Sequence, residues 1–262
     1  MPEKGIRKEI GMKADFHSHI LPNFDDGAAD EKTALEMIKA SAGMGVDHIV
    51  STSHCYPYSG GDITEFVRER NAAYSRLKAA VAEAGAELPD IRLGSEVHLT
   101  CDLSSLPGIE KLCIEGTRYM LLEMPSSKWS DERLDLVYKL TISGIKPIIA
   151  HMERNLGQKK ELVEALLDLD VLVQINSSSF GVSSLKKELD RLFEGGLIHI
   201  IGTDMHNLDT RKPDMDRAEK YIRRRYGNTC WEYLMHNAEL ILGGEELTYR
   251  MLKSFKKKGL FR

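Results

Sequence analysis

Apolar and polar residues follow two alternating periods along the chain. Short apolar runs bounded by glycine or polar residues predict strands, and each run is followed by the 3.6-residue repeat of an amphipathic helix. The predicted strands cover residues 12–17, 46–54, 91–99, 118–125, 146–151, 171–176 and 197–204. The predicted helices cover residues 31–45, 63–85, 132–144, 159–169 and 184–196, and the C-terminal part with Tyr221 and Trp231 is also expected to be helical.

This order of elements predicts the fold class. Strands separated by helices pair in parallel through right-handed crossovers. Seven such units favour an α/β fold of the (β/α) barrel kind with seven strands, and an open doubly wound sheet is the alternative. Residues 100–117 are expected to form a loop with a short helix. No linker or repeat divides the chain, so we expect a single domain over residues 1–262, with a core at about 12–242 and a basic, helical C-terminal tail, KSFKKKGLFR.

Composition narrows the possible environments and partners. The chain has 42% hydrophobic and 29% charged residues and a formal net charge of −4, which gives no general reason to bind nucleic acid. It has neither a secretory signal nor an apolar run long enough to span a membrane. The four cysteines show no CxxC pair. We therefore expect a reduced, cytoplasmic protein.

The residues suited to catalysis cluster at the carboxyl ends of the predicted strands, where barrel enzymes place their active sites. Six of the seven strand ends carry imidazole or carboxylate groups, and the loop containing NFDDG begins at the same end. The candidates are His17, His19, Asp26, His54, Glu96, Glu123, His151, Asp204 and His206. The sixth strand ends instead in Asn176 and serines.

A metal cluster would explain this set. Residues at i and i+2 of a strand share a face, so His17 and His19 can both turn into the barrel mouth. Mixed nitrogen and oxygen ligands suit zinc, manganese or iron, and carboxylates also suit magnesium. The set is too large for one ion, and because a glutamate can bridge two cations it indicates two or three.

Each candidate also has an ordinary structural explanation. An isolated HxH pair is weak evidence, His54 could be a capping or surface residue, and Asp204 could cap a helix. Glu96 and Glu123 could be salt-bridge partners, although an unpaired carboxylate in an apolar strand is costly. The remaining histidines are assigned structural roles: His48, His98, His199 and His236. Among these, His98 is nearest to the predicted site because it lies two residues beyond Glu96.

The motifs DFHSHILPNFDDG, STSH, GSEV, LLEMP, IIAHMERN and IGTDMHN occur in this order. Together they resemble the polymerase and histidinol phosphatase (PHP) superfamily. More narrowly, they are similar to the bacterial metal-dependent tyrosine phosphatases encoded with capsular and exopolysaccharide genes. The resemblance covers residues 12–242 and implies a distorted seven-stranded barrel with a three-metal site that usually uses manganese.

The resemblance also implies roles for individual residues. It places His17, His19, Glu96 and Asp204 around one metal. It places His54, Glu123 and His151 with Glu96 around a second, and Asp26 and His206 near a third. Arg154, in HMERN, and Arg211, in NLDTR, match the phosphate-binding arginines of the family.

One departure from the family lies in STSHCYP, where many relatives carry a second histidine or a basic residue after the first. Here the residue is Cys55. A cysteine-dependent phosphatase would need an arginine six residues later to cradle phosphate, and this chain has Gly61. Cys55 is therefore expected to be a bystander. The nearby Tyr56 and Tyr58, in CYPYSGGD, could form a rim for a phenyl ring or a plain surface loop.

The expected activity is hydrolysis of phosphotyrosine by metal-activated hydroxide, with no phosphoenzyme. By resemblance, the substrate would be the tyrosine-rich tail of an autophosphorylating bacterial tyrosine kinase. The nearest alternative is histidinol phosphate or another small phosphate ester on the same metal site. A metal-dependent amidohydrolase, a nuclease and a non-enzymatic scaffold are more remote.

Overall fold

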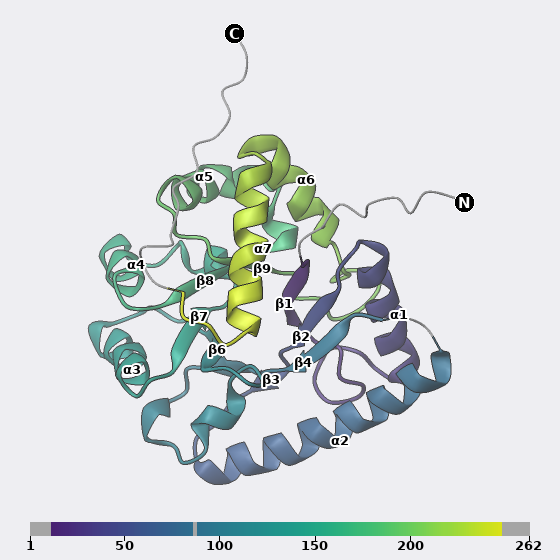
Figure 1. The fold of residues 1–262 in the computed structure, drawn as a ribbon. Coiled ribbons are helices and arrows are strands. Elements are labelled where there is room, and N and C mark those ends of the chain that lie inside the picture. Colours follow the sequence, from purple (N-terminus) through teal and green to yellow (C-terminus); the bar gives the residue numbers. More distant parts are fainter. Residues whose placement is uncertain (1–11, 86–87, 248–262) are drawn as a thin grey trace.

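The computed structural model describes residues 12–85 and 88–247, so the expected basic tail lies outside the described residues. Nine strands occur in this part of the chain. They are β1 (Ala14–Ser18), β2 (His48–Ser51), β3 (His54–Cys55), β4 (Asp90–Leu93), β5 (Glu96–His98), β6 (Tyr119–Glu123), β7 (Lys146–Ile149), β8 (Leu172–Asn176) and β9 (Ile200–Gly202). Helices surround them in an α/β arrangement (Figure 1).

All strand pairs are parallel and fall into two sheets, with the orders β1-β2-β4 and β3-β5-β6-β7-β8-β9. The strands curl round, so that the segment after β9 reaches β1 of the other sheet. The amide of Asp204 donates to the carbonyl of His17 (2.7 Å), and the amide of His19 donates to the carbonyl of Met205 (2.9 Å). The parallel α/β class is therefore confirmed, whereas a single uninterrupted sheet of seven strands is not observed.

The difference from the predicted strands has a local cause. Residues 46–54 form β2 and β3, and residues 91–99 form β4 and β5, with a break in each case. The breaks lie side by side, because β2 pairs with β4 while β3 pairs with β5. At the second break, a Cβ on Gly94 would lie 3.2 Å from a methyl group of Val50. The two neighbouring segments are therefore interrupted at the same level, which an apolar pattern does not reveal.

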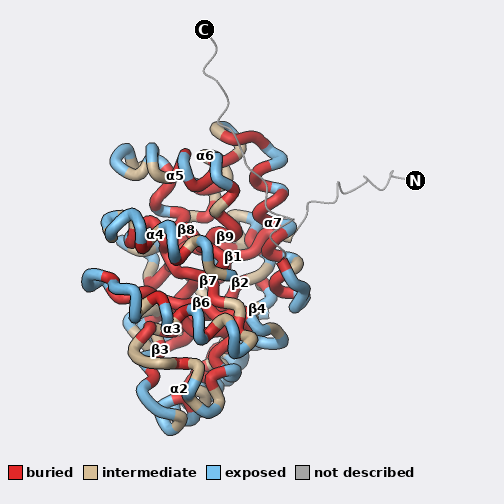
Figure 2. The backbone as a smooth tube through the Cα atoms, turned by 90° about the vertical axis from the view of Figure 1, so that its left-hand side faces the viewer, coloured by how far each residue is buried: buried red, intermediate tan, exposed pale blue. Residues whose placement is uncertain are grey.

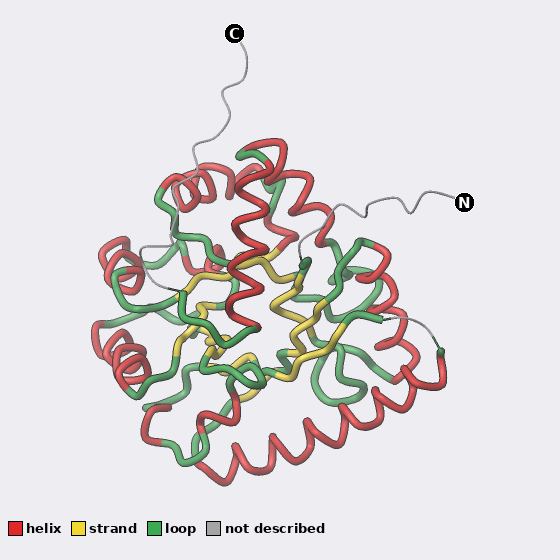
Figure 3. The backbone as a smooth tube through the Cα atoms, in the orientation of Figure 1, coloured by secondary structure: helices red, strands yellow, loops and turns green. Residues whose placement is uncertain are grey.

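Helices lie around the strands (Figure 3), and their bounds are close to the predicted ranges. They are α1 (Glu31–Gly43), α2 (Gly60–Ala84), α3 (Asp131–Ile142), α4 (Lys160–Leu167), α5 (Lys186–Glu194), α6 (Met215–Arg225) and α7 (Asn228–Leu242). The longest, α2, begins with a reciprocal capping box between Ser59 and Asp62 and ends at Gly85 in the left-handed conformation. Residues 100–117 contain two short 3-10 turns, η1 (Leu103–Ser105) and η2 (Ile109–Leu112).

The core has two apolar clusters. The larger fills the space between the strands and the outer helices, and the strands lie in the buried interior (Figure 2). The smaller joins inner residues of the strands, such as Phe16, Leu121 and Ile200, to Ala238 and Ile241 of α7. Helix α7 packs on β1 and β9, so an apolar layer supports the curled sheet. None of the helices in the described ranges combines the length and apolarity that a membrane crossing requires.

Candidate metal centre

The structure brings all nine predicted metal ligands together at the carboxyl ends of the strands. Glu96 lies at the centre: its Oε2 is 3.2 Å from His17 Nε2, 3.3 Å from His19 Nε2 and 3.0 Å from His54 Nδ1. Its Oε1 is 2.8 Å from His151 Nε2. In the parallel register of β3 and β5, His54 lies directly opposite Glu96. One buried carboxylate thus faces four imidazoles, which come from β1, β3 and β7 or the residues just after them.

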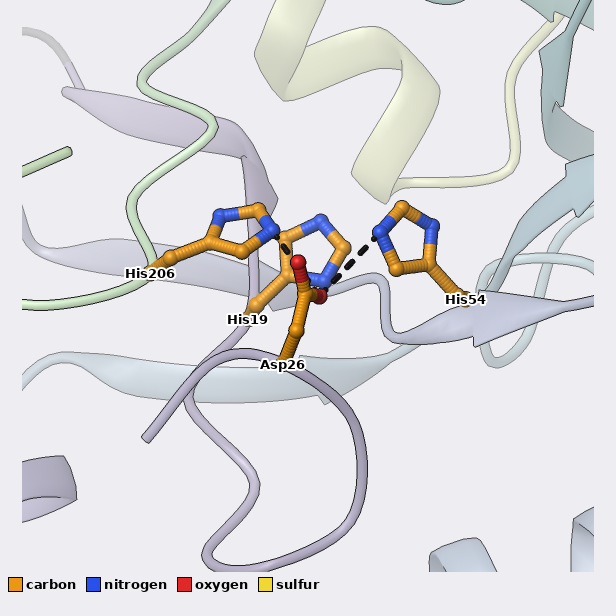
Figure 4. A group of neighbouring side chains, drawn as sticks. All are labelled: His19, Asp26, His54 and His206. Carbon is orange, nitrogen blue, oxygen red and sulfur yellow. Dashed lines mark ion pairs between the residues drawn. The ribbon is translucent and has the colours of Figure 1, made fainter. Parts of the chain in front are cut away.

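The remaining candidates extend this contact network. Asp204 Oδ1 is 3.3 Å from His17 Nε2, and Glu123 Oε1 is 3.8 Å from His151 Nε2. Asp26 Oδ1 lies 3.3 Å from both His54 Nε2 and His206 Nε2, so the loop after β1 closes over the cluster (Figure 4).

Three overlapping groups of side chains have ligand atoms within 4.8 Å of one another. They are His17, His19 and Glu96; His54, Glu96 and Glu123; and His19, Asp26, His54 and His206. Shared members link all three groups, and the sharing matches the bridging glutamate expected from the number of ligands.

Hydrogen bonds behind the imidazoles set which nitrogen faces inward. His17 Nδ1 donates to Gln174 Oε1 (3.2 Å), and His19 Nδ1 donates to Asp25 Oδ2 (2.8 Å). In a neutral imidazole that donates through Nδ1, Nε2 carries the lone pair, and these two Nε2 atoms face each other at 3.1 Å. Two lone pairs at this distance repel, so the pair needs positive charge between the nitrogens, either a proton or a bound cation. Such outer hydrogen bonds are typical of metal-bound histidines.

The pKa shifts of His19 and Glu96 also indicate that the cluster attracts positive charge. Burial alone would lower the pKa of His19, but Asp25 and Glu96 raise it to about 10. Burial likewise opposes charge on Glu96, but His17 and His151 hold its pKa well below the usual value. The carboxylates thus create a strong local demand for positive charge.

Several buried polar atoms in the cluster lack a hydrogen-bond partner among the described residues. They include Glu96 Oε2, His54 Nδ1 and His206 Nε2. A buried unsatisfied group is costly, and native structures rarely tolerate several together. His206 Nδ1 already donates to the Asp204 carbonyl (2.9 Å), which leaves Nε2 as the ligand atom. The residues present therefore fit divalent cations.

Asp25 and Gln174 hold the site in place and were missed by the sequence analysis. Asp25 accepts from His19 Nδ1 and from the amides of Gly27 (3.0 Å) and His54 (3.2 Å). Gln174 accepts from His17 and from the amide of His151 (2.8 Å). The adjacent pair Asp25–Asp26 offered a signal, but the sequence could not show which of the two turns toward the protein.

The two predicted phosphate-binding arginines meet at Asp204. Arg211 Nη2 donates to Asp204 Oδ1 (2.6 Å), and Arg154 Nη2 donates to Asp204 Oδ2. The side chain of Arg154 is 49% exposed and that of Arg211 37%. Among the described residues, Arg154 makes no other side-chain hydrogen bond or ion pair. Both guanidinium groups thus have N–H donors left for an anion at the mouth.

The backbone is constrained around the ligands. His151 and Asp204 have positive φ angles of 32° and 57°, which residues other than glycine rarely adopt. Behind the first two histidines the chain passes very closely. A Cβ on Gly27 would lie 2.1 Å from the His19 carbonyl oxygen, and one on Gly202 would lie 2.4 Å from His17 Cβ. These glycines allow the loop and β9 to approach β1.

The histidines assigned structural roles divide into two kinds. His48, His199 and His236 lie outside the candidate ligand groups. His98 also lies outside these groups, but its Nδ1 lies 2.8 Å from Glu123 Oε2. It contacts a candidate ligand at the edge of the site, as its i+2 spacing from Glu96 allows.

Cys55 has the properties of a bystander. Its thiol is buried, and burial raises its pKa to about 12, so it is not a thiolate at neutral pH. All four cysteines are free of disulfides.

A curled parallel α/β sheet with a histidine–carboxylate cluster at its carboxyl ends defines a metal-site protein of the barrel-like α/β class. The family model described as capsular polysaccharide synthesis, CpsB/CapC, matches residues 13–243. The chain therefore belongs to the CpsB/CapC family, in agreement with the resemblance in its motifs.

Individual relatives agree with this assignment. The chain is 31% identical to the tyrosine-protein phosphatase YwqE of Bacillus subtilis, with 94% of this chain and 98% of the relative covered. It is 32% identical to the tyrosine-protein phosphatase CpsB of Streptococcus agalactiae serotype III, over 87% of this chain and 97% of the relative. A solved chain, from crystal structures of YwqE from Bacillus subtilis and CpsB from Streptococcus pneumoniae described as metal-dependent tyrosine phosphatases, superposes with a TM-score of 0.76. It has 26% identity and covers 94% of this chain and all of the solved one.

Proposed function

We propose that the chain is a metal-dependent phosphatase that hydrolyses phosphotyrosine in proteins. The observation that carries the proposal is the set of three linked ligand groups beside two partly exposed arginines. The activity named for YwqE and CpsB supports it. All nine predicted ligands are proposed to hold the cations, in a single barrel of the PHP type.

The proposed ions are three divalent cations, with manganese favoured and zinc, iron or magnesium as alternatives. Such cations neutralise phosphoryl charge and lower the pKa of water. The protein fixes their positions through Glu96, which faces four imidazoles, and through Asp25 and Gln174 behind the histidines.

Arg154 and Arg211 are proposed to bind the phosphoryl oxygens. Guanidinium groups present paired N–H donors that match phosphate geometry. Both now share Asp204, so they lie beside the ligand groups and retain free donors. A tyrosine side chain leaves as a phenolate of pKa ~10, which needs less help from a general acid than an alkoxide does.

The alternatives gain no specific support. Histidinol phosphate would use the same cations and arginines, but the relatives reported above carry tyrosine-phosphatase names. The amidohydrolase alternative generally needs a bridging lysine, and the three ligand groups found in the described ranges contain none. We further propose that the substrate is an autophosphorylating bacterial tyrosine kinase and that the protein acts in the cytoplasm, where its unpaired cysteines would stay reduced.

The direct test uses the purified full-length protein, stripped of metal and reloaded with manganese, zinc or magnesium. Turnover of a phosphotyrosine peptide and of histidinol phosphate is then measured. Peptide hydrolysis is expected to require metal, to survive Cys55→Ser and to fall about 100-fold in Arg154→Lys, because a positioned donor is lost from the transition state. Hydrolysis of histidinol phosphate alone, or of neither substrate with any metal, would reject the proposal.

A further inference from the structure

Side chains alternate in direction along β3 and β5, and this places a second pair of inward-facing side chains above the ligands. His54 and Glu96 lie in register and face the cluster, whereas Cys55 and Val97 turn outward into the larger apolar cluster. The next residue that faces inward on β5 is His98, and the residue after β3 with the same orientation is Tyr56. A tyrosine and an imidazole therefore stand side by side at the rim.

The ring contacts agree with this placement. The Tyr56 ring centroid lies 5.4 Å from that of His98, at an interplanar angle of 40°, and 5.9 Å from that of His54. The ring thus lies beside one imidazole of the ligand cluster and one imidazole of the rim.

Tyr56 is nevertheless 53% exposed. Aromatic rings this exposed beside a polar cluster have surface left for another aromatic ring, and such pairs form at centroid distances of roughly 4.5–7 Å. In an aryl phosphate only one oxygen separates the phosphorus from the ring. A phosphoryl group held next to His54 would therefore bring its ring to the exposed part of Tyr56.

We propose that Tyr56 is a specificity-determining residue that binds the aromatic ring of the substrate and so favours aryl over alkyl phosphate esters. The inference rests on the proposed phosphatase function and deepens it. Tyr58 provides a matched control: it is 69% exposed, its amide donates to Asp62, and its ring contacts no other aromatic ring among the described residues.

The experiment measures binding as well as turnover in the metal-loaded protein. Calorimetry gives the affinities of benzylphosphonate and ethylphosphonate, which share the anionic group and differ in the ring. Tyr56→Leu is expected to lower the ratio of the two affinities about twofold to tenfold, the size of one aromatic pair. Tyr56→Phe should restore the ratio, and Tyr58→Leu should leave it unchanged. The KM for a phosphotyrosine peptide should rise in Tyr56→Leu by a similar factor, with kcat little changed.

The outcomes separate this inference from the proposed function. An unchanged affinity ratio in Tyr56→Leu, or an equal fall in Tyr58→Leu, overturns the role of Tyr56 even if the wild-type protein hydrolyses the peptide. A wild-type protein that binds benzylphosphonate preferentially through Tyr56 but hydrolyses no phosphotyrosine keeps the ring-binding site and rejects the phosphatase function.

Discussion

Two buried carboxylates, Glu96 in β5 and Asp190 in α5, have very different partners. Asp190 Oδ1 accepts from Arg225 Nε (2.6 Å) and from the Tyr226 hydroxyl (2.7 Å), while its other oxygen accepts from a second nitrogen of Arg225. Glu96 faces four imidazoles, and its Oε2 has no hydrogen-bond partner among the described residues. Both side chains are withdrawn from water.

The difference lies in the supply of donors. The guanidinium and the phenol are permanent donors, so the charge of Asp190 is matched inside the protein and its site is complete. Around Glu96, the Nδ1–H groups of His17 and His19 donate to Gln174 and Asp25. The Nε2 atoms that face Glu96 are therefore mostly acceptors. A buried group of acceptors is a cation site, whereas a buried acid with matched donors is structural.

Glu96→Gln should have the largest effect. The substitution keeps the shape of the side chain but removes the charge that two of the three ligand groups share. We expect metal-dependent phosphatase activity to fall by at least about 100-fold, beyond the effect typical of an outer-shell change. Metal content by mass spectrometry and turnover check this. His236→Ala, on an exposed part of α7, is the control and should behave as wild type. A fully active Glu96→Gln protein would mean that the cluster is not the metal site.

Asp25→Asn should weaken metal binding about 10-fold to 100-fold, because the amide no longer balances the charge on His19 or fixes its tautomer. Calorimetric metal titration measures the change. Asp209→Asn, on the exposed loop after β9, keeps the same chemical change away from the site and should have no effect. Unaltered affinity in Asp25→Asn would show that the outer hydrogen bond does not matter.

Asp190→Asn should affect stability and leave activity intact. Arg225 would lose a charged partner in a mostly buried position, at a cost of about 2 kcal/mol in the free energy of unfolding. Thermal unfolding should begin several degrees lower, and kcat/KM of the folded fraction should be unchanged. A loss of activity without a loss of stability would remove the distinction between the two carboxylates.

The smallest expected effect is a change in how the stability of the protein depends on pH, and it involves His199. Burial lowers its pKa to about 4, from 6.5 in the unfolded chain. Since the unfolded state then binds more protons, stability is fully present above pH 6.5 and is lost as the pH falls toward 4. Between pH 7 and 5.5 the loss is about 1 kcal/mol. His199→Asn can still accept from the Val173 amide and should flatten this part of the stability–pH curve. An equally steep curve would assign the slope to other groups.

Much of the site could be predicted because strand ends follow simple geometry. The position of a residue at the end of a parallel strand gives its edge of the sheet, and i, i+2 spacing gives its face, so His54 and Glu96 could be expected to meet. The alternation of strands and helices likewise indicated the parallel α/β class.

The rest depends on contacts that sequence patterns do not encode. The breaks in the two split strands lie side by side in the pairing of β2 with β4 and of β3 with β5, which joins segments far apart in the chain. Whether Asp25 or Asp26 turns inward depends on how a loop folds over β1. The contact between His98 and Glu123 likewise depends on tertiary packing, which the i+2 spacing from Glu96 allows but does not dictate.

The close passage of Gly27 and Gly202 behind the first two histidines has a consequence for mutational tolerance. Neither residue carries a functional group, yet any side chain would collide with the backbone of His19 or with His17 Cβ. In a saturation mutagenesis screen these two positions should be as intolerant as the ligands themselves, and even alanine should fail there. Sensitivity to substitution in this protein would then report the steric constraints around the candidate metal centre as well as the identity of its ligands.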